Sequence, residues 1–379
     1  MRSCRALVVP ILITALVLLA APSARAAGTV RNVVIFIGDG MGDGQIATAA
    51  ELAPPERPLV IPSAPVTGLM RTTADGAFVT DSAASGTALA CGFKTTRGTV
   101  GQLPDGTQVE NLMEAAHRNG LATGVVTTSG LVDATPATFS VHALRRDLYT
   151  RILRAQLTDP LDVMIGGDYA AYPRAAEARG YMEMVDGAAG LVPEGTVVVR
   201  SEEELAKASL DTRLVALLPP RETMKDQHGP PLAVTVRAAL QRLAQNPRGF
   251  VLMAECEVTD SAGHDNDLGG VLAGVRELDA AVAVALEFAR THPGTLIVVT
   301  ADHDTGGLGI IDGAGPEDVE VSWASHHHTA QWVPVFAWGS GAGTFTGVFQ
   351  NSDLGPRIGG LLHVEGYPRR LPGGESAGR

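Results

Sequence analysis

The sequence predicts an α/β fold, a three-layer sandwich in which a large, mostly parallel central sheet is flanked by helices on both faces. Short apolar runs alternate with amphipathic segments along most of the chain, which is the pattern of strands joined by crossover helices. A hydrophobic content of 45% in 379 residues suffices for a large core, and 44 glycines supply tight turns. We expect a single domain over residues 27–368, followed by a disordered tail, 369–379, rich in Gly and Pro.

The N-terminus has the features of a secretory signal peptide, residues 1–26. Arg2 and Arg5 precede an apolar run over residues 6–21, and residues 24–26 (ARA) offer a small-x-small cleavage site. An uncleaved anchor is the alternative, but the run is short for a membrane span. We therefore expect a periplasmic or secreted protein with no stable membrane anchor after cleavage.

The charge of the chain excludes some partners. Cleavage removes three arginines and no acid, so the mature chain is more negative than the −12 of the full sequence. An acidic exported protein is not expected to bind nucleic acid. An anionic substrate must then be attracted locally, by metal ions or an arginine. Cys91 and Cys256 remain after cleavage, and either a disulfide or two buried thiols is compatible with their apolar surroundings.

Continuous runs of branched apolar residues predict strands that are buried on both faces. These runs cover residues 32–37, 122–128, 161–165, 250–254, 295–300 and 332–338. Amphipathic helices are predicted where apolar residues recur at helical spacing, at 109–119, 232–245 and 269–290. Residues 169–231 have weaker signals, short helices and short strands, and we interpret them as peripheral.

A serine stands at the start of another predicted helix. Asp81 and Ser82 precede a run of small residues that continues to Cys91. The first N–H groups of a helix have no partner within it and can hold an anion, so a hydroxyl placed there can attack that anion. The alternative is a helix N-cap, a common role for Asp or Ser at this position.

Groups of acids and histidines follow several of the predicted strands. They are Asp39, residues 255–264, Asp302 with His303, and residues 326–328 (HHH). Ligands of open α/β sheets bind beyond the carboxyl ends of the strands, so these groups are expected to meet. Asp260 and His264 are four residues apart and share one face of a helical turn. A carboxylate with an imidazole suits zinc, and clustered acids require cations.

These residues resemble the motifs of the alkaline phosphatase family over nearly all of the mature chain. The motifs occur in the family's order: IFIGDGMG at 35–42, VTDSAAS at 79–85, DATPA at 133–137, the acid and histidine segment at 255–264, TADHDTGG at 300–307 and HTAQWVPVFAWG at 328–339. Each motif alone is a weak signal, whereas the ordered set is specific.

The resemblance implies a phosphoserine intermediate on Ser82 and a phosphate clamp by Arg146, with its neighbour Arg145 as the competing candidate. It also implies two zinc ions and one magnesium ion as cofactors. The implied ligands are Asp260, His264 and His328 for one zinc, Asp39, Asp302 and His303 for the other, and Asp39, Thr135 and Glu255 for magnesium, with Asp133 behind the magnesium.

Some residues depart from the family pattern. Ser261 stands where relatives often have Lys, His or Trp, so a phosphate contact is missing or different. The segment between His303 and His328 is short, and in relatives this region contributes to the dimer contact. We therefore expect either a monomer or a homodimer. Among the consecutive histidines, His328 is chosen because Thr329 follows it, as in the family motif.

The predicted function is hydrolysis of small-molecule phosphate monoesters. A phosphodiesterase of the same superfamily is the alternative enzyme, but that branch lacks the magnesium set of Thr135 and Glu255. A phosphate or metal scavenging protein is the alternative outside enzymes, but binding alone does not require Ser82.

Overall fold

A computed structural model describes residues 29–167, 175–219, 221 and 228–372. The predicted signal peptide, residues 1–26, lies outside the described residues. No helix in the described part of the chain combines the length and the apolar character that crossing a bilayer requires.

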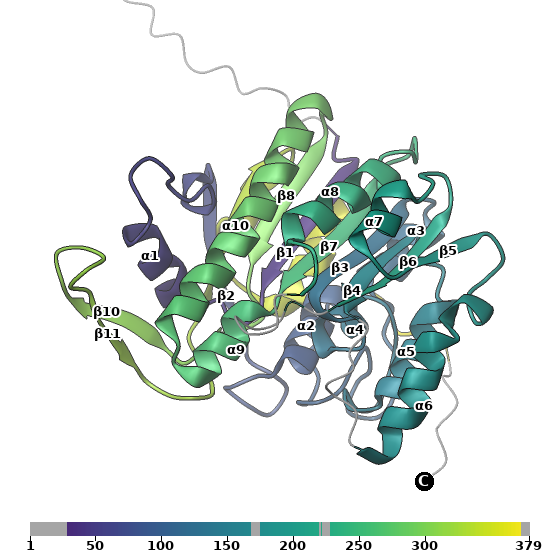
Figure 1. The fold of residues 1–379 in the computed structure, drawn as a ribbon, viewed down its shortest axis with the longest axis horizontal. Helices are drawn as coiled ribbons and strands as arrows, with labels where there is room; N and C mark the ends of the chain where they lie inside the picture. Colours follow the sequence, from purple (N-terminus) through teal and green to yellow (C-terminus); the bar gives the residue numbers. More distant parts are fainter. Residues whose placement is uncertain (1–28, 168–174, 220, 222–227, 373–379) are drawn as a thin grey trace, which may run out of the picture.

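The fold is organised around a ten-stranded sheet with the order β14-β2-β13-β8-β1-β7-β3-β4-β6-β5 (Figure 1). Strand β13 runs antiparallel to β2 and β8, and the other strand pairings in this sheet are parallel. The predicted large, mostly parallel sheet is confirmed. Its strands are β1 (Asn32–Gly38), β2 (Val66–Arg71), β3 (Ala122–Gly130), β4 (Val163–Gly167), β5 (Thr196–Val199), β6 (Arg213–Leu218), β7 (Phe250–Cys256), β8 (Thr295–Thr300), β13 (Val333–Gly339) and β14 (Gly347–Gln350).

Helices cover both faces of this sheet. On one face, α8 (Leu232–Leu243) and α10 (Leu268–Thr291) pack against each other and across the central strands (Figure 1). Helices α3 (Leu112–Arg118) and α4 (Ala134–Thr138) pack on β3 and β7 from the other face. The other α-helices are α1 (Asp43–Glu51), α2 (Ser82–Cys91), α5 (Tyr149–Thr158), α6 (Ala175–Asp186), α7 (Glu202–Lys207), α9 (Val258–Asp265) and α11 (Leu354–Leu361).

The central strands form the core, as their apolar runs predict. Every residue of β7 and β8 is buried, and so is every residue of β1 except Asn32. Full burial of a side chain such as Ile35, Phe36 or Ile37 contributes about 1.5–3 kcal/mol relative to exposure. The strands therefore occupy fixed positions, and the polar residues that follow them are held by a rigid support.

The register of the central strands brings their carboxyl ends to one level. Ile37 in β1 lies opposite Glu255 in β7 and Thr300 in β8, and Thr127 in β3 also pairs with Glu255. Asp39 and Asp302 each follow two residues beyond this level. Residues from distant parts of the sequence thus meet at one edge of the sheet.

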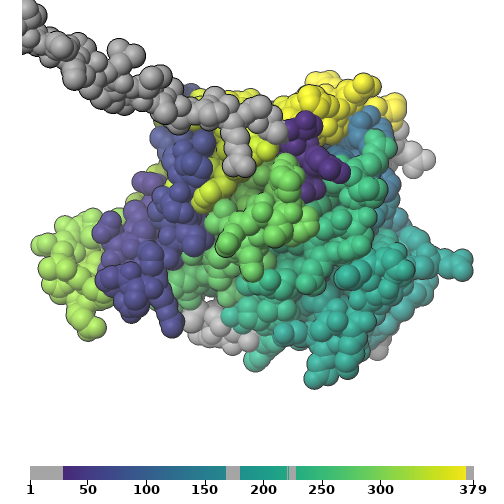
Figure 2. Space-filling view, turned by 90° about the horizontal axis from the view of Figure 1, so that it is seen from above, coloured from purple at the N-terminus to yellow at the C-terminus, as the bar shows by residue number. Residues whose placement is uncertain are grey.

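Two small sheets complete the fold. Strands β10 (Leu308–Asp312) and β11 (Glu320–Trp323) form an antiparallel hairpin that lies beside α1 at one end of the molecule (Figures 1 and 2). Strand β9 (Asp304–Thr305) pairs with β12 (His328–Thr329), with His328 opposite Thr305. This pairing places His328 beside the segment that follows β8, which contains Asp302 and His303.

The structure differs from the sequence analysis in two places. The interpretation of residues 169–231 as peripheral is wrong for β5 and β6, which extend the main sheet beyond β4. The predicted tail begins too early, because the Glu110 N–H donates to the Arg369 carbonyl at 3.0 Å and the Leu371 N–H donates to Gln108 at 2.9 Å. Residues 373–379 of that tail lie outside the described residues.

The structure also decides between the two alternatives for the cysteines: Cys91 and Cys256 are both buried free thiols.

Candidate active site

Ser82 is the first residue of α2, and Asp81 is its N-cap. The Ala84 N–H donates to Asp81 Oδ1 at 3.0 Å, so the capping role belongs to Asp81 and the Ser82 hydroxyl is not needed for it. Ser82 Oγ instead lies 3.3 Å from His303 Nε2. The side chain is 3% exposed, at the wall of a cleft of about 430 Å³ beyond the sheet edge.

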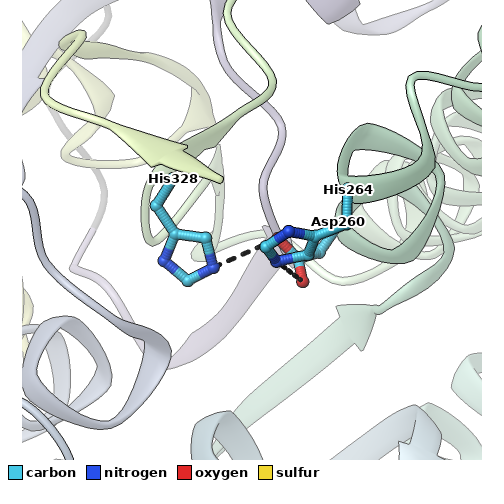
Figure 3. A group of neighbouring side chains, drawn as sticks. All are labelled: Asp260, His264 and His328. Carbon is cyan, nitrogen blue, oxygen red and sulfur yellow. Dashed lines mark ion pairs between the residues drawn. The ribbon is translucent and has the colours of Figure 1, made fainter. Parts of the chain in front are cut away.

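One group of possible metal ligands consists of Asp260, His264 and His328 (Figure 3). The first two lie in α9 and the third in β12. His264 Nε2 is 3.3 Å from Asp260 Oδ2, and His328 Nε2 is 3.6 Å from Asp260 Oδ1.

Both imidazoles of this group are oriented by backbone carbonyls. His264 Nδ1 donates to the His326 carbonyl at 2.7 Å, and His328 Nδ1 donates to the Thr80 carbonyl at 3.0 Å. Because Nδ1 of each ring donates to a carbonyl, Nε2, which faces Asp260, is the nitrogen that could bind a cation once it is deprotonated, the arrangement that metal-ligating histidines usually have.

A second group consists of Asp39, Asp302 and His303, and all three are fully buried or nearly so. His303 Nε2 lies 3.5 Å from Asp39 Oδ1 and 3.1 Å from Asp302 Oδ2. The same nitrogen faces Ser82 Oγ, so this group and the serine converge on one point.

A third group has oxygen ligands only: Asp39, Glu255 and Glu257. Thr135, in α4, lies beside it, with Oγ1 at 3.4 Å from Asp39 Oδ2. The Thr127 hydroxyl donates to Glu255 Oε2 at 2.6 Å and orients that carboxylate. Within the described chain, Asp39 Oδ1 and Glu255 Oε1 are buried and accept no hydrogen bond.

Arg146 lines the cleft and Arg145 does not. Arg146 Nη2 donates to Asp133 Oδ1 at 3.0 Å, and Nη1 lies 3.6 Å from Asp81 Oδ2. The side chain of Arg145 is 69% exposed and forms an ion pair with Asp147. The two neighbouring arginines therefore point to different surroundings.

Burial and mutual repulsion shift the pKa values of the acids. Burial, followed by the charge of Asp302, raises the pKa of Asp39 well above its ordinary range. Burial raises the pKa of Glu255 to about 8, with Asp133 adding to the effect. For Asp302, burial followed by the charge of Asp260 raises the pKa to about 7. Without added positive charge this edge of the sheet thus holds protons at neutral pH.

Asp260 behaves in the opposite way. Burial alone would raise the pKa of Asp260, but its hydrogen bond to His264 and the nearby His303 and His328 outweigh burial and lower it. The same pairing with Asp260 raises the pKa of His264 to about 9. Asp260 and His264 therefore stabilise each other's charged forms, whereas burial lowers the pKa of His328.

The chelated, metal-free protein is expected to lose thermal stability as the pH rises from about 5 to 9. In the unfolded chain the carboxyls of Glu255 and Asp302 ionise near pH 4. The folded chain holds their protons until pH 7 to 8, so the stability linked to those protons is lost over this range. The raised pKa of His264 acts in the same direction.

Calorimetry of the chelated protein across this pH range measures the effect, and we expect Tm to fall by several degrees. Protein supplied with divalent cations is the control and is expected to show a smaller fall, because cations replace the protons. A metal-free protein that is more stable at pH 9 than at pH 6 would contradict the prediction.

The structure brings together every residue that the sequence analysis assigned to the site, and it adds Glu257 and Asp81. Glu257 had a sequence signal, because it stands two residues after Glu255 at the end of a strand, where alternate residues point the same way. Asp81 was considered only as a cap; it also holds Arg146.

Comparison with known proteins shows the family of this chain. The family model for alkaline phosphatase matches residues 30–317. Alkaline phosphatase 4 of Bacillus subtilis (strain 168) is 32% identical over 294 residues, which cover 74% of this chain and 63% of that protein. The match thus spans less than two thirds of the length of this curated relative.

Solved structures agree with this result. The alkaline phosphatase from the Antarctic bacterium TAB5 superposes with a TM-score of 0.79 at 28% identity, covering 89% of this chain and 99% of that one. A mutant of the TAB5 enzyme, with Mg bound in its M3 site, has a TM-score of 0.78 at 27% identity and the same coverage.

Proposed function

Because this chain belongs to the alkaline phosphatase family, we propose that it is a metal-dependent hydrolase that releases inorganic phosphate from small-molecule phosphate monoesters. The observation that carries the proposal is the position of the Ser82 hydroxyl, at the start of α2 and 3.3 Å from His303 Nε2. A scavenging protein would need donors and cations, but not a nucleophile among them.

The ligand groups fit two zinc ions and one magnesium ion. Two of them combine carboxylates with imidazole nitrogens, the set that zinc prefers: Asp260, His264 and His328, and Asp39, Asp302 and His303. The oxygen atoms of Asp39, Thr135 and Glu255 suit magnesium, with Asp133 behind them, and a TAB5 mutant has Mg bound in its M3 site. Bound there, the cations would supply Lewis acidity and positive charge beside the serine and the phosphate.

The chain's own residues account for the rest of the reaction. Ser82 Oγ would displace the alcohol from phosphorus and carry the phosphoryl group as phosphoserine, which water then hydrolyses. The dipole of α2 favours the negative charge that arrives at its N-terminus. Asp133 and Asp81 hold the Arg146 guanidinium at the cleft, where its planar donors can bind two phosphate oxygens at once.

The proposal also places the protein outside the cytoplasm, in the periplasm or the medium. It is supported by the charged start, the apolar run and the cleavage pattern of residues 1–26. The mass of the exported chain tests this, because cleavage leaves a mature protein that begins near Ala27.

Arg146→Ala is expected to reduce hydrolysis of monoesters more than hydrolysis of diesters. A monoester dianion has three non-bridging oxygens, and in this proposal Arg146 holds two of them. A diester has a bulky group in place of one of these oxygens. A charged hydrogen-bond partner contributes roughly 1.5–3 kcal/mol, so kcat/KM for an aryl phosphate should fall by about tenfold to more than a hundredfold.

The experiment compares an aryl phosphate with the matching diester, in wild-type protein and in variants whose metal content is measured. Arg145→Ala is the matched control and should change little, because its side chain is exposed. Equal losses on both esters would mean that Arg146 acts through folding or metal assembly. A wild-type protein that prefers the diester would replace the proposal with the phosphodiesterase alternative.

A further inference from the structure

We propose that Glu257 is a direct ligand of the divalent cation in the oxygen-only group, beside Asp39 and Glu255. The inference rests on the proposed metal-dependent function and adds a carboxylate to the magnesium site that the family resemblance implies. One carboxylate oxygen from each of the three residues lies within 4.8 Å of the others, close enough to share one ion.

The end of β7 directs Glu257 into this group. Side chains alternate along β7, so Glu255 and Cys256 project to opposite sides. Glu257 follows directly as the N-cap of α9, and its carboxylate lies on the side of Glu255, within the ligand group. Cys256 accordingly packs toward α10, where its thiol donates to the Gly274 carbonyl at 3.5 Å. Glu257 lines the cleft and is 7% exposed.

Local hydrogen bonds hold Glu257 at this position. Its backbone N–H donates to Thr128 Oγ1 at 3.0 Å, which ties the end of β7 to β3. Its Oε1 lies 3.4 Å from the Ser261 hydroxyl, one turn further along α9. The backbone bond to Thr128 and the contact with Ser261 thus hold the Glu257 carboxylate in the cleft.

The ionised form of the group favours a bound cation. Three carboxylates that meet in a buried place repel one another unless positive charge lies between them. The nearby Arg146 is engaged by Asp133 and Asp81. Buried oxygens of Asp39 and Glu255 accept no hydrogen bond from any described residue, so they are available as ligands.

The chemistry of the donors selects the ion. Carboxylate and hydroxyl oxygens bind hard cations, and Mg²⁺ takes octahedral oxygen sites. With Glu257 present, the group offers three carboxylates and the Thr135 hydroxyl. A third anionic ligand strengthens attraction to any divalent hard cation, so this site is expected to hold Mg²⁺ or Mn²⁺ more tightly than two carboxylates would.

The test is calorimetric titration of Mg²⁺ into zinc-loaded protein, with Mn²⁺ binding followed by electron paramagnetic resonance as a second readout. Glu257→Gln should weaken binding of both ions by at least about tenfold, since even outer residues of metal sites cost that much when removed. Glu257→Asp keeps the charge but shortens the reach, and should weaken binding as well. Zinc content, measured for each variant, should not change.

Asp265→Asn is the matched control, because Asp265 lines the same cleft but is outside the ligand group. Its Mg²⁺ affinity should stay within about threefold of wild type, the size of a screened charge effect. Equal losses in Asp265→Asn and Glu257→Gln, or full affinity in Glu257→Asp, would overturn the inference. If wild-type protein cleaves monoesters and binds zinc but these variants bind Mg²⁺ normally, the inference fails and the proposed function stands.

Discussion

Ser82→Ala protein is expected to keep its bound metals and to lose nearly all phosphatase activity. The substitution removes the only atom in the proposal that can carry the phosphoryl group, while the ligand groups around it are unchanged. Losses that follow removal of a serine nucleophile in other enzymes indicate a fall in kcat of roughly a thousandfold or more. Steady-state assays with an aryl phosphate measure the loss of activity, and metal analysis measures whether the variant keeps its metals.

A labelling experiment tests the role of Ser82 directly. Wild-type protein quenched in acid with radiolabelled substrate should carry phosphate on Ser82, and the alanine variant should carry none. Ser85→Ala is the matched control, because Ser85 lies one turn later in α2 and its hydroxyl donates to the Asp302 carbonyl at 2.7 Å. Label on a different residue, or full activity in Ser82→Ala, would defeat the assignment.

His328→Ala is expected to reduce zinc affinity by on the order of a hundredfold and to reduce activity with it. The substitution removes an imidazole whose Nε2 lies 3.6 Å from Asp260 Oδ1. Asp260 and His264 remain, so excess zinc should restore part of the activity. Zinc content after dialysis and activity against added zinc are the measurements.

The neighbouring histidines serve as controls. His327 is exposed and outside the ligand group, so His327→Ala should retain zinc. His326→Ala should have an effect smaller than that of His328→Ala, because the His326 ring nitrogens lie at hydrogen-bond distance from the His264 carbonyl and the Asn266 side chain, and His326 is outside the ligand group. If His326→Ala proves the more damaging change, the register assigned to the last motif is off by two residues.

The proposed substrate class and the proposed metals rest on different kinds of information. Ligand types follow from residue chemistry, because carboxylate with imidazole and carboxylate with hydroxyl suit different ions. The proposed preference for monoesters rests on position, because Arg146 lines the same cleft as Ser82. The experiments above separate these two inferences.

The sequence by itself determined the central strands and the residue types of the site. β8 was expected at 295–300 and is found there, because a short, continuous run of branched apolar residues favours a strand buried on both faces. Asp260 and His264 were expected to meet because a four-residue spacing in a helix places them on one face, and they are 3.3 Å apart. Such features depend on local geometry, which sequence spacing encodes.

Only the tertiary structure decided which of several adjacent residues of the same type belongs to the site. Arg145 and Arg146 have the same side chain, and only the packing around them places the second one against Asp133 and Asp81. His328 was chosen from the triplet by motif register, whereas in the structure it is brought to Asp260 by the pairing of β12 with β9. Long-range pairing, which no local pattern contains, determines where these side chains point.

The same reason explains Glu257 and the outer strands. Glu257 becomes part of a ligand group because the parallel register sets the end of β7 level with the ends of β1 and β3. Strands β5 and β6 have weak local signals, yet they extend the sheet because the exposed edge of β4 offers unpaired backbone groups. Composition and spacing determined what this chain could bind, and strand pairing across the whole sheet decided which residues meet to bind it.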